Sequence, residues 1–348
     1  MSELFERINS IKGVDKKKVE SVQTRFDKLA KPLRGLGILE ELICKIGGID
    51  DSLDISKRCV VVACADNGIV EEGVTQTSSD VTAIVANNIL HGQATVCKMS
   101  KIARADVFPI DVGMKTEVEN LRTEKTMRGT NNFAKTQAMS NSDAEKAILT
   151  GMNLVKELKN SGYKLIAVGE MGIGNTTTSS AVAAVLTNSE VKDVTSKGAG
   201  LSNEGVKHKI QVIENVIKRL EPNGNIPLDV LTKVGGLDIA CMCGVFLGGA
   251  ENGVPLVIDG FISSVACLLA TKFNENVIDY VLPSHMSNEG GAKIVMNFLG
   301  LKPPITAEMA LGEGTGAVAL MPLLDMALVV LNEMVTFEAT NIEEYKPL

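Results

Sequence analysis

Five runs of apolar, largely β-branched residues constrain the fold of this chain more than any other feature of its sequence. Each run ends in an acidic or polar residue next to a glycine or a turn, and the runs lie at residues 58–66, 105–113, 163–170, 254–260 and 277–285. Continuous apolar runs of this length are typical of strands buried on both faces. Helical patterns separate the runs, and this alternation predicts an α/β fold with a mostly parallel sheet and helices on both faces.

Two of the intervening helices have clear sequence signals. Residues 142–160 begin with Ser142 and carry Glu145 three positions later, which is the pattern of a capping box, and Gly162 follows the last turn. Residues 203–220 place apolar side chains at alternating spacings of four and three, which gives a helix with one apolar stripe.

The two ends of the chain predict a separate group of helices. A charged helix is expected over residues 14–30 and an apolar helix over residues 317–335. We expect them to pack together as a small helical subdomain, formed by residues 1–35 and 317–348, beside a large α/β domain of residues 36–316.

Composition and charge argue against several classes of protein. The net charge of −7 disfavours nucleic acid as the main partner, because a phosphate-binding face needs concentrated Lys and Arg. The N-terminus lacks the apolar stretch of a secretion signal, and the two longest apolar stretches each contain an aspartate, so no membrane span is expected. The seven cysteines lie mostly within apolar runs, as reduced core thiols do. The expected location is the cytoplasm.

The predicted strands also indicate where a ligand would bind. In a parallel sheet the carboxyl ends of the strands face one side, and ligands bind in the crevice there. The polar residues that we expect to gather around this crevice are Asp66, Asp111, Glu170, Asp259 and the pair Ser284–His285.

A glycine- and threonine-rich segment, Gly169–Thr178, follows one predicted strand and opens a helix. Glycines let successive N–H groups point into one concavity, the helix adds its positive end, and threonine hydroxyls add donors, so the segment suits a phosphate. The alternative is a plain turn between strand and helix with threonine caps. A dinucleotide-binding loop is disfavoured, since Thr177 stands where the third glycine of G-x-G-x-x-G belongs.

A second segment, Leu311–Ala317, places Glu313 between Gly312 and Gly314. A carboxylate flanked by glycines is open to close approach by a bulky ligand, and together with Glu170 it makes a pair of carboxylates suited to proton transfer. The alternative is an acid at a helix N-terminus that balances the helix dipole.

These two segments resemble the signature segments of the nicotinate-nucleotide–dimethylbenzimidazole phosphoribosyltransferase family. The resemblance covers about residues 31–320, and its other motifs follow the family's order: KPLRGLGILE, ADNGIVEEGVTQTSSDVT, DVGM, RGTNNFAKTQAM, GGLDIA, VIDGFISSVACLLA, SHMSNEGG and LGLKPPI. It implies a Rossmann-like sheet, a small helical domain from both termini, and a homodimer whose active site borrows from the neighbouring subunit.

The resemblance also implies a reaction and its residues. The family converts nicotinate mononucleotide and dimethylbenzimidazole to α-ribazole phosphate and nicotinate, and on this pattern Glu313 is the catalytic base and Glu170 a second active-site acid. Lys209 would reach the phosphate across the dimer interface. The phosphate-binding turn maps onto Gly172, Gly174, Asn175, Thr176 and Thr177, and the base pocket onto Gln76, Ser78, Ser79, Ile84, Met171 and Leu311.

The residue types fit this chemistry. Nicotinate attached to ribose is a pyridinium, which departs as a neutral ring and needs no general acid, whereas the incoming benzimidazole must lose its N–H proton to a base such as a carboxylate. No pyrophosphate leaves, so neither a magnesium clamp nor a cofactor is expected. The three histidines are separated in the sequence, which disfavours a metal site.

Several residues depart from the family pattern. Asn67 replaces the histidine of an Asp-His-Gly motif, and Ala310 replaces an arginine that some relatives have before LGEG. The segment 76–79 also differs, so the accepted base stays open among benzimidazoles, purines and phenolic compounds. The alternative function is a non-catalytic or partner-dependent subunit, paired with a paralogue in a heteromer; retention of Glu170 and Glu313 favours an active enzyme.

Overall fold

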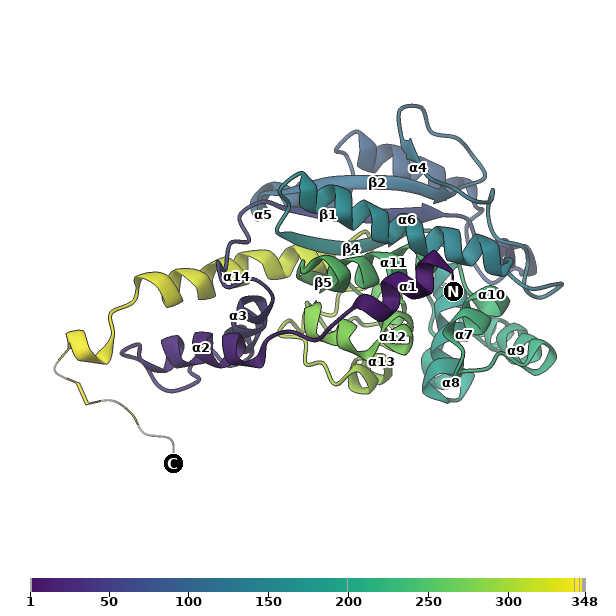
Figure 1. The fold of residues 1–348 in the computed structure, drawn as a ribbon. Coiled ribbons are helices and arrows are strands. Elements are labelled where there is room, and N and C mark those ends of the chain that lie inside the picture. The colour runs from purple at the N-terminus through teal and green to yellow at the C-terminus, as the bar shows by residue number, and fades with distance from the viewer. Residues whose placement is uncertain (1, 199, 341, 344, 346–348) are drawn as a thin grey trace.

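The computed structural model describes residues 2–198, 200–340, 342–343 and 345, and within them one parallel sheet of six strands forms the centre of the fold (Figure 1). The strand order is β3-β2-β1-β4-β5-β6, and every neighbouring pair is parallel. The α/β fold predicted from the apolar runs is therefore confirmed. The strands are β1 Arg58–Ala65, β2 Ala105–Gly113, β3 Arg122–Thr123, β4 Leu165–Met171, β5 Leu256–Ile258 and β6 Val281–Pro283.

Helices cover both faces of the sheet because its central strands are apolar on both sides. Along β1, Val61 and Ala63 belong to one core, whereas Val60 and Val62 belong to the other, as the twofold repeat of a strand requires. Helices α6, α7, α11 and α12 enclose the first core, and α3, α4, α5 and α14 enclose the second (Figure 1).

The helices of the described residues have the following bounds: α1 Glu3–Ser10, α2 Lys16–Asp27, α3 Ile38–Ile49, α4 Asp80–Leu90, α5 Thr95–Ala103, α6 Asn141–Asn160, α7 Asn175–Thr187, α8 Val191–Val194, α9 Asn203–Leu220, α10 Pro227–Val234, α11 Leu237–Asn252, α12 Phe261–Phe273, α13 Ala292–Leu299 and α14 Thr315–Glu333. Three short 3-10 helices are η1 Gly68–Glu72, η2 Glu275–Tyr280 and η3 Phe337–Ala339.

The last predicted strand is shorter than its apolar run. Only β6 belongs to the sheet, because the first half of the run forms η2 instead. This 3-10 helix begins where the side chain of Asn274 accepts a hydrogen bond from Asn276 N (3.0 Å). A local side-chain cap thus competes successfully with sheet pairing.

The predicted capping box of α6 is displaced by two residues. Ser140, not Ser142, is the last residue with extended backbone, and its Oγ accepts a hydrogen bond from Asp143 N (3.2 Å). The N-cap is the residue that precedes the first helical one, so a serine already inside the helix cannot act as the cap. The prediction for α9 is correct: the helix spans residues 203–220 and Ser202 caps it.

The terminal segments pack in two places. α1 lies against α6 and α11, where Leu4 and Ile8 join the first core. α2 packs on α3, α3 packs on α14, and the backbone of Leu29 forms an antiparallel bridge with Thr336, so α2 and the segment after α14 come together at the left of Figure 1. The division into a large domain and a small helical subdomain stays a prediction.

Among the described residues, α14 is the one helix whose length and composition would allow it to cross a membrane. Half of it is buried within the protein, and it packs on α3, α5 and β4. Its Asp325 forms an ion pair with the buried Arg58 of β1 (2.6 Å). These contacts are those of a core helix on a sheet.

The contact between α6 and α11 allows a direct test of the packing. Gly151 of α6 and Gly244 of α11 face each other so closely that a Cβ on either would clash with backbone of the other helix. We expect Gly151→Ala to lower the free energy of unfolding by about 1–3 kcal/mol, since backbone cannot yield as a side-chain tip can. Urea denaturation measures this. Gly205→Ala in α9 is the matched control, expected to be neutral or slightly stabilising because only flexible side chains lie near its Cβ.

Candidate active site

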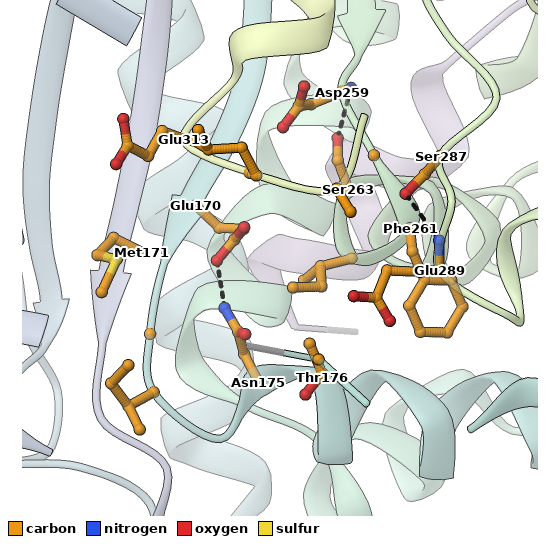
Figure 2. Close-up of a pocket in the computed structure, with 18 of the residues that line it drawn as sticks. Glu170, Met171, Asn175, Thr176, Asp259, Phe261, Ser263, Ser287, Glu289 and Glu313 are labelled. Atoms are coloured by element: carbon orange, nitrogen blue, oxygen red, sulfur yellow. Dashed lines mark hydrogen bonds between the residues drawn. The ribbon is translucent and has the colours of Figure 1, made fainter. Parts of the chain in front are cut away.

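A cavity opens at the carboxyl ends of β4, β5 and β6, on the side of the sheet where the sequence predicted a crevice (Figure 2). The strand-end residues Glu170, Asp259 and His285 line it, and so does Glu313 from the turn before α14. Further lining residues that matter below are Met171, Gly172, Asn175, Thr176, Ser287, Glu289, Ala310 and Leu311.

Asp66 and Asp111 do not line this cavity, although the sequence led us to expect them there. Asp111 is paired with Lys125 (2.6 Å) and its Oδ1 accepts a hydrogen bond from Met114 N (2.8 Å). Asp66 Oδ2 accepts a hydrogen bond from Lys115 N (2.7 Å). Both carboxylates are used to fix the loop that follows β2.

The turn that carries Glu313 has an uncommon backbone. Gly312, Glu313 and Gly314 have φ angles of 88°, 60° and 90°. A glutamate in this left-handed region costs about 1 kcal/mol or more, so its surroundings must hold the turn in place. A Cβ on Gly169 would lie 2.6 Å from Gly314 N and 2.7 Å from the carbonyl carbon of Glu313. The two glycine-rich segments therefore touch backbone to backbone.

Asp259, just after β5, anchors the same turn. Its Oδ2 accepts a hydrogen bond from Gly314 N (3.0 Å) and its Oδ1 accepts one from Gly316 N (2.7 Å). Burial raises the pKa of Asp259, and the nearby His285 and these amides oppose the rise. Burial lowers the pKa of His285, against the attraction of Asp259. Asp259 thus caps the N-terminus of α14 and fixes where Glu313 stands.

The Glu313 carboxylate lies at the N-terminus of α5. Its Oε2 accepts a hydrogen bond from Val96 N (3.2 Å), and Figure 2 shows it pointing away from the carboxylate of Glu170. Glu313 does lie at a helix N-terminus, as the alternative interpretation of the sequence predicted. The helix is α5, however, and not α14, which follows Glu313 along the chain. Burial raises the pKa of Glu313, whereas the α5 amides favour its ionised form. Such a group is suited to accept a proton near neutral pH.

Glu170 belongs to the first glycine-rich segment, and its side chain lies where the two segments meet and is shielded from water. Its Oε2 accepts a hydrogen bond from Asn175 Nδ2, dashed in Figure 2, and a Cβ on Gly312 would lie 2.6 Å from its Oε1. Burial, reinforced by the Asp238 carboxylate, raises the pKa of Glu170 to about 8. At neutral pH Glu170 therefore keeps its proton, unlike an exposed glutamate.

The turn between β4 and α7 forms another wall of the cavity. Gly172, Asn175 and Thr176 line it, and α7 starts at Asn175 without a side-chain cap. Gly174, with φ of 91°, lines a smaller adjoining hollow. Thr177 is buried outside both linings, and its hydroxyl has no hydrogen-bond partner among the described residues. An uncapped helix N-terminus at a cavity suits an anion.

Lys209 reaches this turn from α9 of the same chain. Its Nζ donates hydrogen bonds to Thr176 Oγ1 (2.8 Å) and Ser196 O (3.4 Å), and the residue is 1% exposed. Because α9 packs on α7 of its own chain, Lys209 contacts the turn within one chain, and its expected reach to the phosphate across a dimer interface stays a prediction. Burial lowers the pKa of Lys209 to about 8, and the nearest opposing carboxylate, Glu289, accepts a hydrogen bond from Ser196. A buried cation in this state favours an anionic ligand.

Comparison with known proteins agrees with this geometry. The family model DBI_PRT, described as phosphoribosyltransferase, matches residues 11–342. The chain belongs to this phosphoribosyltransferase family. It is 45% identical over 345 residues to the nicotinate-nucleotide–dimethylbenzimidazole phosphoribosyltransferase of Clostridium acetobutylicum, with 98% of each chain covered. It is 44% identical over 347 residues to the enzyme of that name from Ruminiclostridium cellulolyticum, with 99% of each covered.

A solved structure extends the comparison to the fold. The crystal structure of the nicotinate-nucleotide–dimethylbenzimidazole phosphoribosyltransferase of Thermus thermophilus matches with a TM-score of 0.88 and 36% identity, and the match covers 94% of this chain and 99% of that one. The membership inferred from short motifs thus holds over nearly the whole chain.

The residues expected to form a base pocket do not all lie together. Met171 and Leu311 line the main cavity, whereas Gln76 lines the adjoining hollow. Those that line neither are Ser78, Ser79 and Ile84, and Ile84 is 58% exposed. The segment that precedes α4 lies on the surface of the single chain. Its closeness to other motifs along the sequence therefore does not bring it to the cavity.

Two of the departures from the family pattern, Ala310 and Asn67, lie at the site. Ala310 lines the cavity, where a small side chain leaves room. Asn67 is buried beneath the turn, and its Nδ2 donates a hydrogen bond to Ile173 O (3.3 Å). Asn67 therefore supports the backbone of the anion-binding turn from below.

Sequence reasoning missed several residues of the site, among them three with ionisable or hydroxyl side chains. Ser287 and Glu289 line the cavity, and Asp238 lies buried behind Glu170. Their segments, SHMSNEGG and GGLDIA, contributed to the family resemblance, but a single sequence gave no reason to prefer one polar residue in them over another.

Lys209 allows a test of the anion site by stability. We expect Lys209→Met to raise the free energy of unfolding of the ligand-free protein by about 1–3 kcal/mol at pH 7, because it removes a buried charge whose folded-state pKa lies below its unfolded value. The difference from wild type should shrink as pH rises above about 8, where Lys209 loses its proton in the folded state. Denaturant unfolding at several pH values measures it.

The same variant should lose the stabilisation that added inorganic phosphate gives the wild type. Lys207→Met is the matched control, since Lys207 is exposed two positions earlier on α9. A Lys207→Met protein that behaves like Lys209→Met, or a Lys209→Met protein still stabilised by phosphate, contradicts the assignment.

Proposed function

We propose that this phosphoribosyltransferase moves the phosphoribosyl group of nicotinate mononucleotide to dimethylbenzimidazole or a related base, giving α-ribazole phosphate and nicotinate for cobamide synthesis. One observation carries the proposal: contact of Gly169 with the 312–314 turn brings a carboxylate and an anion-binding turn to the same cavity. The names of the relatives supply the substrate class.

Glu313 has the properties that this reaction requires of its base. The bond from C1′ of the ribose to the nicotinate nitrogen breaks and its electron pair stays with the ring, which leaves neutral. The benzimidazole nitrogen forms the new bond to C1′, and the N–H proton on its other nitrogen passes to the Glu313 carboxylate. Attack opposite the leaving group turns the β-nucleotide into the α-product.

The phosphate of the nucleotide would bind at the N-terminus of α7. Thr176 offers a hydroxyl there, and the Lys209 ammonium lies beside that hydroxyl. Both donors are buried or half-enclosed, so their interactions with a dianion are stronger than in water. Binding energy from this remote group would place C1′ near Glu313. Since no pyrophosphate leaves, the proposal needs no metal and no cofactor.

We propose that the enzyme acts in the cytoplasm as a homodimer. Free, buried cysteines are compatible with a reducing compartment. Large apolar side chains are exposed on the packed pair α5 and α14, with Ile102 at 80%, Met326 at 62% and Val329 at 51% exposure, which favours a protein interface there. Light scattering on the purified protein tests the assembly, and a monomeric mass would contradict it.

The activity is tested with the purified chain alone. It would be incubated with nicotinate mononucleotide and separate azole, purine and phenolic acceptors, and released nicotinate would be measured by chromatography. Release that depends on an acceptor supports the proposal and ranks the bases. Release only after a paralogous subunit is added would favour the partner-dependent alternative.

Glu313→Gln is expected to lower turnover about 100-fold or more, because an amide cannot take the proton from the incoming base. Affinity for nicotinate mononucleotide, measured by calorimetry, should stay within about threefold. Glu308→Gln is the control, since Glu308 is an exposed carboxylate on the preceding loop. Normal turnover by Glu313→Gln would remove Glu313 from the mechanism.

Thr176→Ala should act on binding instead of chemistry. Loss of one hydroxyl donor to the phosphate is expected to weaken nucleotide affinity about 5- to 10-fold, with a smaller effect on turnover at saturation. Thr187→Ala, in the last turn of the same helix, is the control. Unchanged affinity in Thr176→Ala would mean that the turn binds another group.

A further inference from the structure

Asp238, on the first turn of α11, is a buried acid for which the proposed mechanism has no role. It is 0% exposed, its Oδ1 accepts a hydrogen bond from Ile239 N (2.9 Å), and the side-chain amides of Asn175 and Asn67 favour its ionised form. A fully buried carboxylate calls for an explanation, because burial of a charge is costly unless something is gained.

The amide of Asn175 connects Asp238 with Glu170. A Cβ on Gly172 would lie 2.7 Å from Asp238 Oδ2 and 3.3 Å from Asn175 Nδ2, so both groups lie beneath the turn at Gly172, and the Asn175 amide interacts with the Asp238 carboxylate. The same Nδ2 donates a hydrogen bond to Glu170 Oε2. One amide nitrogen therefore lies between two buried carboxyl groups.

The charges around Asp238 and Glu170 favour a state in which the two carboxyl groups together hold one proton. Burial raises the pKa of Asp238 to about 6 and that of Glu170 to about 8. The charged groups that act most strongly on Glu170 are all carboxylates, namely those of Asp238, Asp259 and Glu313. The titratable groups close to Asp238 on the neighbouring elements are the thiols of Cys64 and Cys241, whose own pKa values burial raises far above neutrality. At neutral pH the proton resides on Glu170.

We propose that Asp238 is a positioning residue: the negative charge of its carboxylate keeps Glu170 protonated, and the Asn175 amide beside it aims Glu170 into the cavity as a hydrogen-bond donor. This rests on the proposed function, because the acceptor of that hydrogen bond is an oxygen of the bound nucleotide. A neutral Glu170 does not repel the phosphate and does not compete with Glu313 for the proton of the incoming base. The fold thus assigns different protonation states to two glutamates in one cavity.

The pH profile of turnover tests the coupling. Wild-type activity should fall on the acid side as Glu313 gains a proton and on the alkaline side as Glu170 loses one. Asp238→Asn removes a negative charge that opposes ionisation of Glu170, so its alkaline limb should move to lower pH by roughly half a unit or more. Substrate titration is common to both proteins and does not contribute to the difference.

Two further variants separate coupling from structure. Asp111→Asn is the matched control: Asp111 is an equally buried acid at the same edge of the sheet but outside the cavity, so its loss should change stability and leave the alkaline limb in place. Glu170→Gln keeps a donor that cannot ionise, so it should retain at least about a tenth of wild-type turnover and lose the alkaline limb, whereas Glu170→Ala should fall about 100-fold.

Several outcomes overturn the proposal. The proposal is wrong if the alkaline limb of the pH profile does not move in Asp238→Asn. It is also wrong if Glu170→Gln loses as much turnover as Glu170→Ala. Should Asp238→Asn not fold, the Glu170→Gln profile alone decides, since persistence of the wild-type limb would show that another group titrates there.

A measurement without substrate distinguishes failure of this proposal from failure of the proposed function. Carbon-13 NMR titration of carboxyl-labelled glutamates reads the pKa of Glu170 directly, with Glu170→Gln to assign the signal. A lower pKa in Asp238→Asn, in a protein that turns over no nucleotide, would sustain the coupling and refute the function. Normal turnover with an unchanged Glu170 pKa would do the reverse.

Discussion

The contact between Gly169 and the 312–314 turn is the constraint on which the rest of the site depends. A residue with any side chain at 169 would push against Gly314 N and the carbonyl carbon of Glu313. The left-handed backbone of the turn exists only because this contact and the Asp259 carboxylate hold it from two sides. Displacement of the 312–314 turn would move Glu313 away from the turn between β4 and α7, and the proposed base would then be separated from the proposed phosphate site.

Three of the helix N-termini at or beside the cavity have different partners. The N-terminus of α14 is occupied by Asp259 and that of α5 by Glu313, both through backbone amides. The N-terminus of α7 has no side-chain cap, and the buried ammonium of Lys209 lies beside it. Two of these positive ends are thus neutralised by the protein's own carboxylates, whereas that of α7 is open to an anion, as the proposed binding of the nucleotide phosphate requires.

The structure differs most from the sequence-based predictions for side chains whose contact partners are far away along the chain. The GEMG and LGEG segments were recognisable alone, because glycines mark positions where backbone approaches backbone or a ligand. Lys209 was identified by its motif, but its contact with Thr176 of the same chain was not predicted, since nothing in a helix stripe tells which helix it packs on. Ser78, Ser79 and Ile84 were grouped with the cavity by proximity in sequence, and the fold keeps them outside it.

The sequence by itself determined the parallel sheet, the edge of the sheet at which the cavity opens, and the two glycine-rich segments that meet there, because apolar periodicity and glycine placement are local properties. Only the tertiary structure decided that Glu313 is held at the N-terminus of α5, that Asp259 is an anchor, and that Asp238 lies behind Glu170. The ionisation of these acids depends on burial and on neighbours brought together by the fold, and neither is written in the order of residues along the chain.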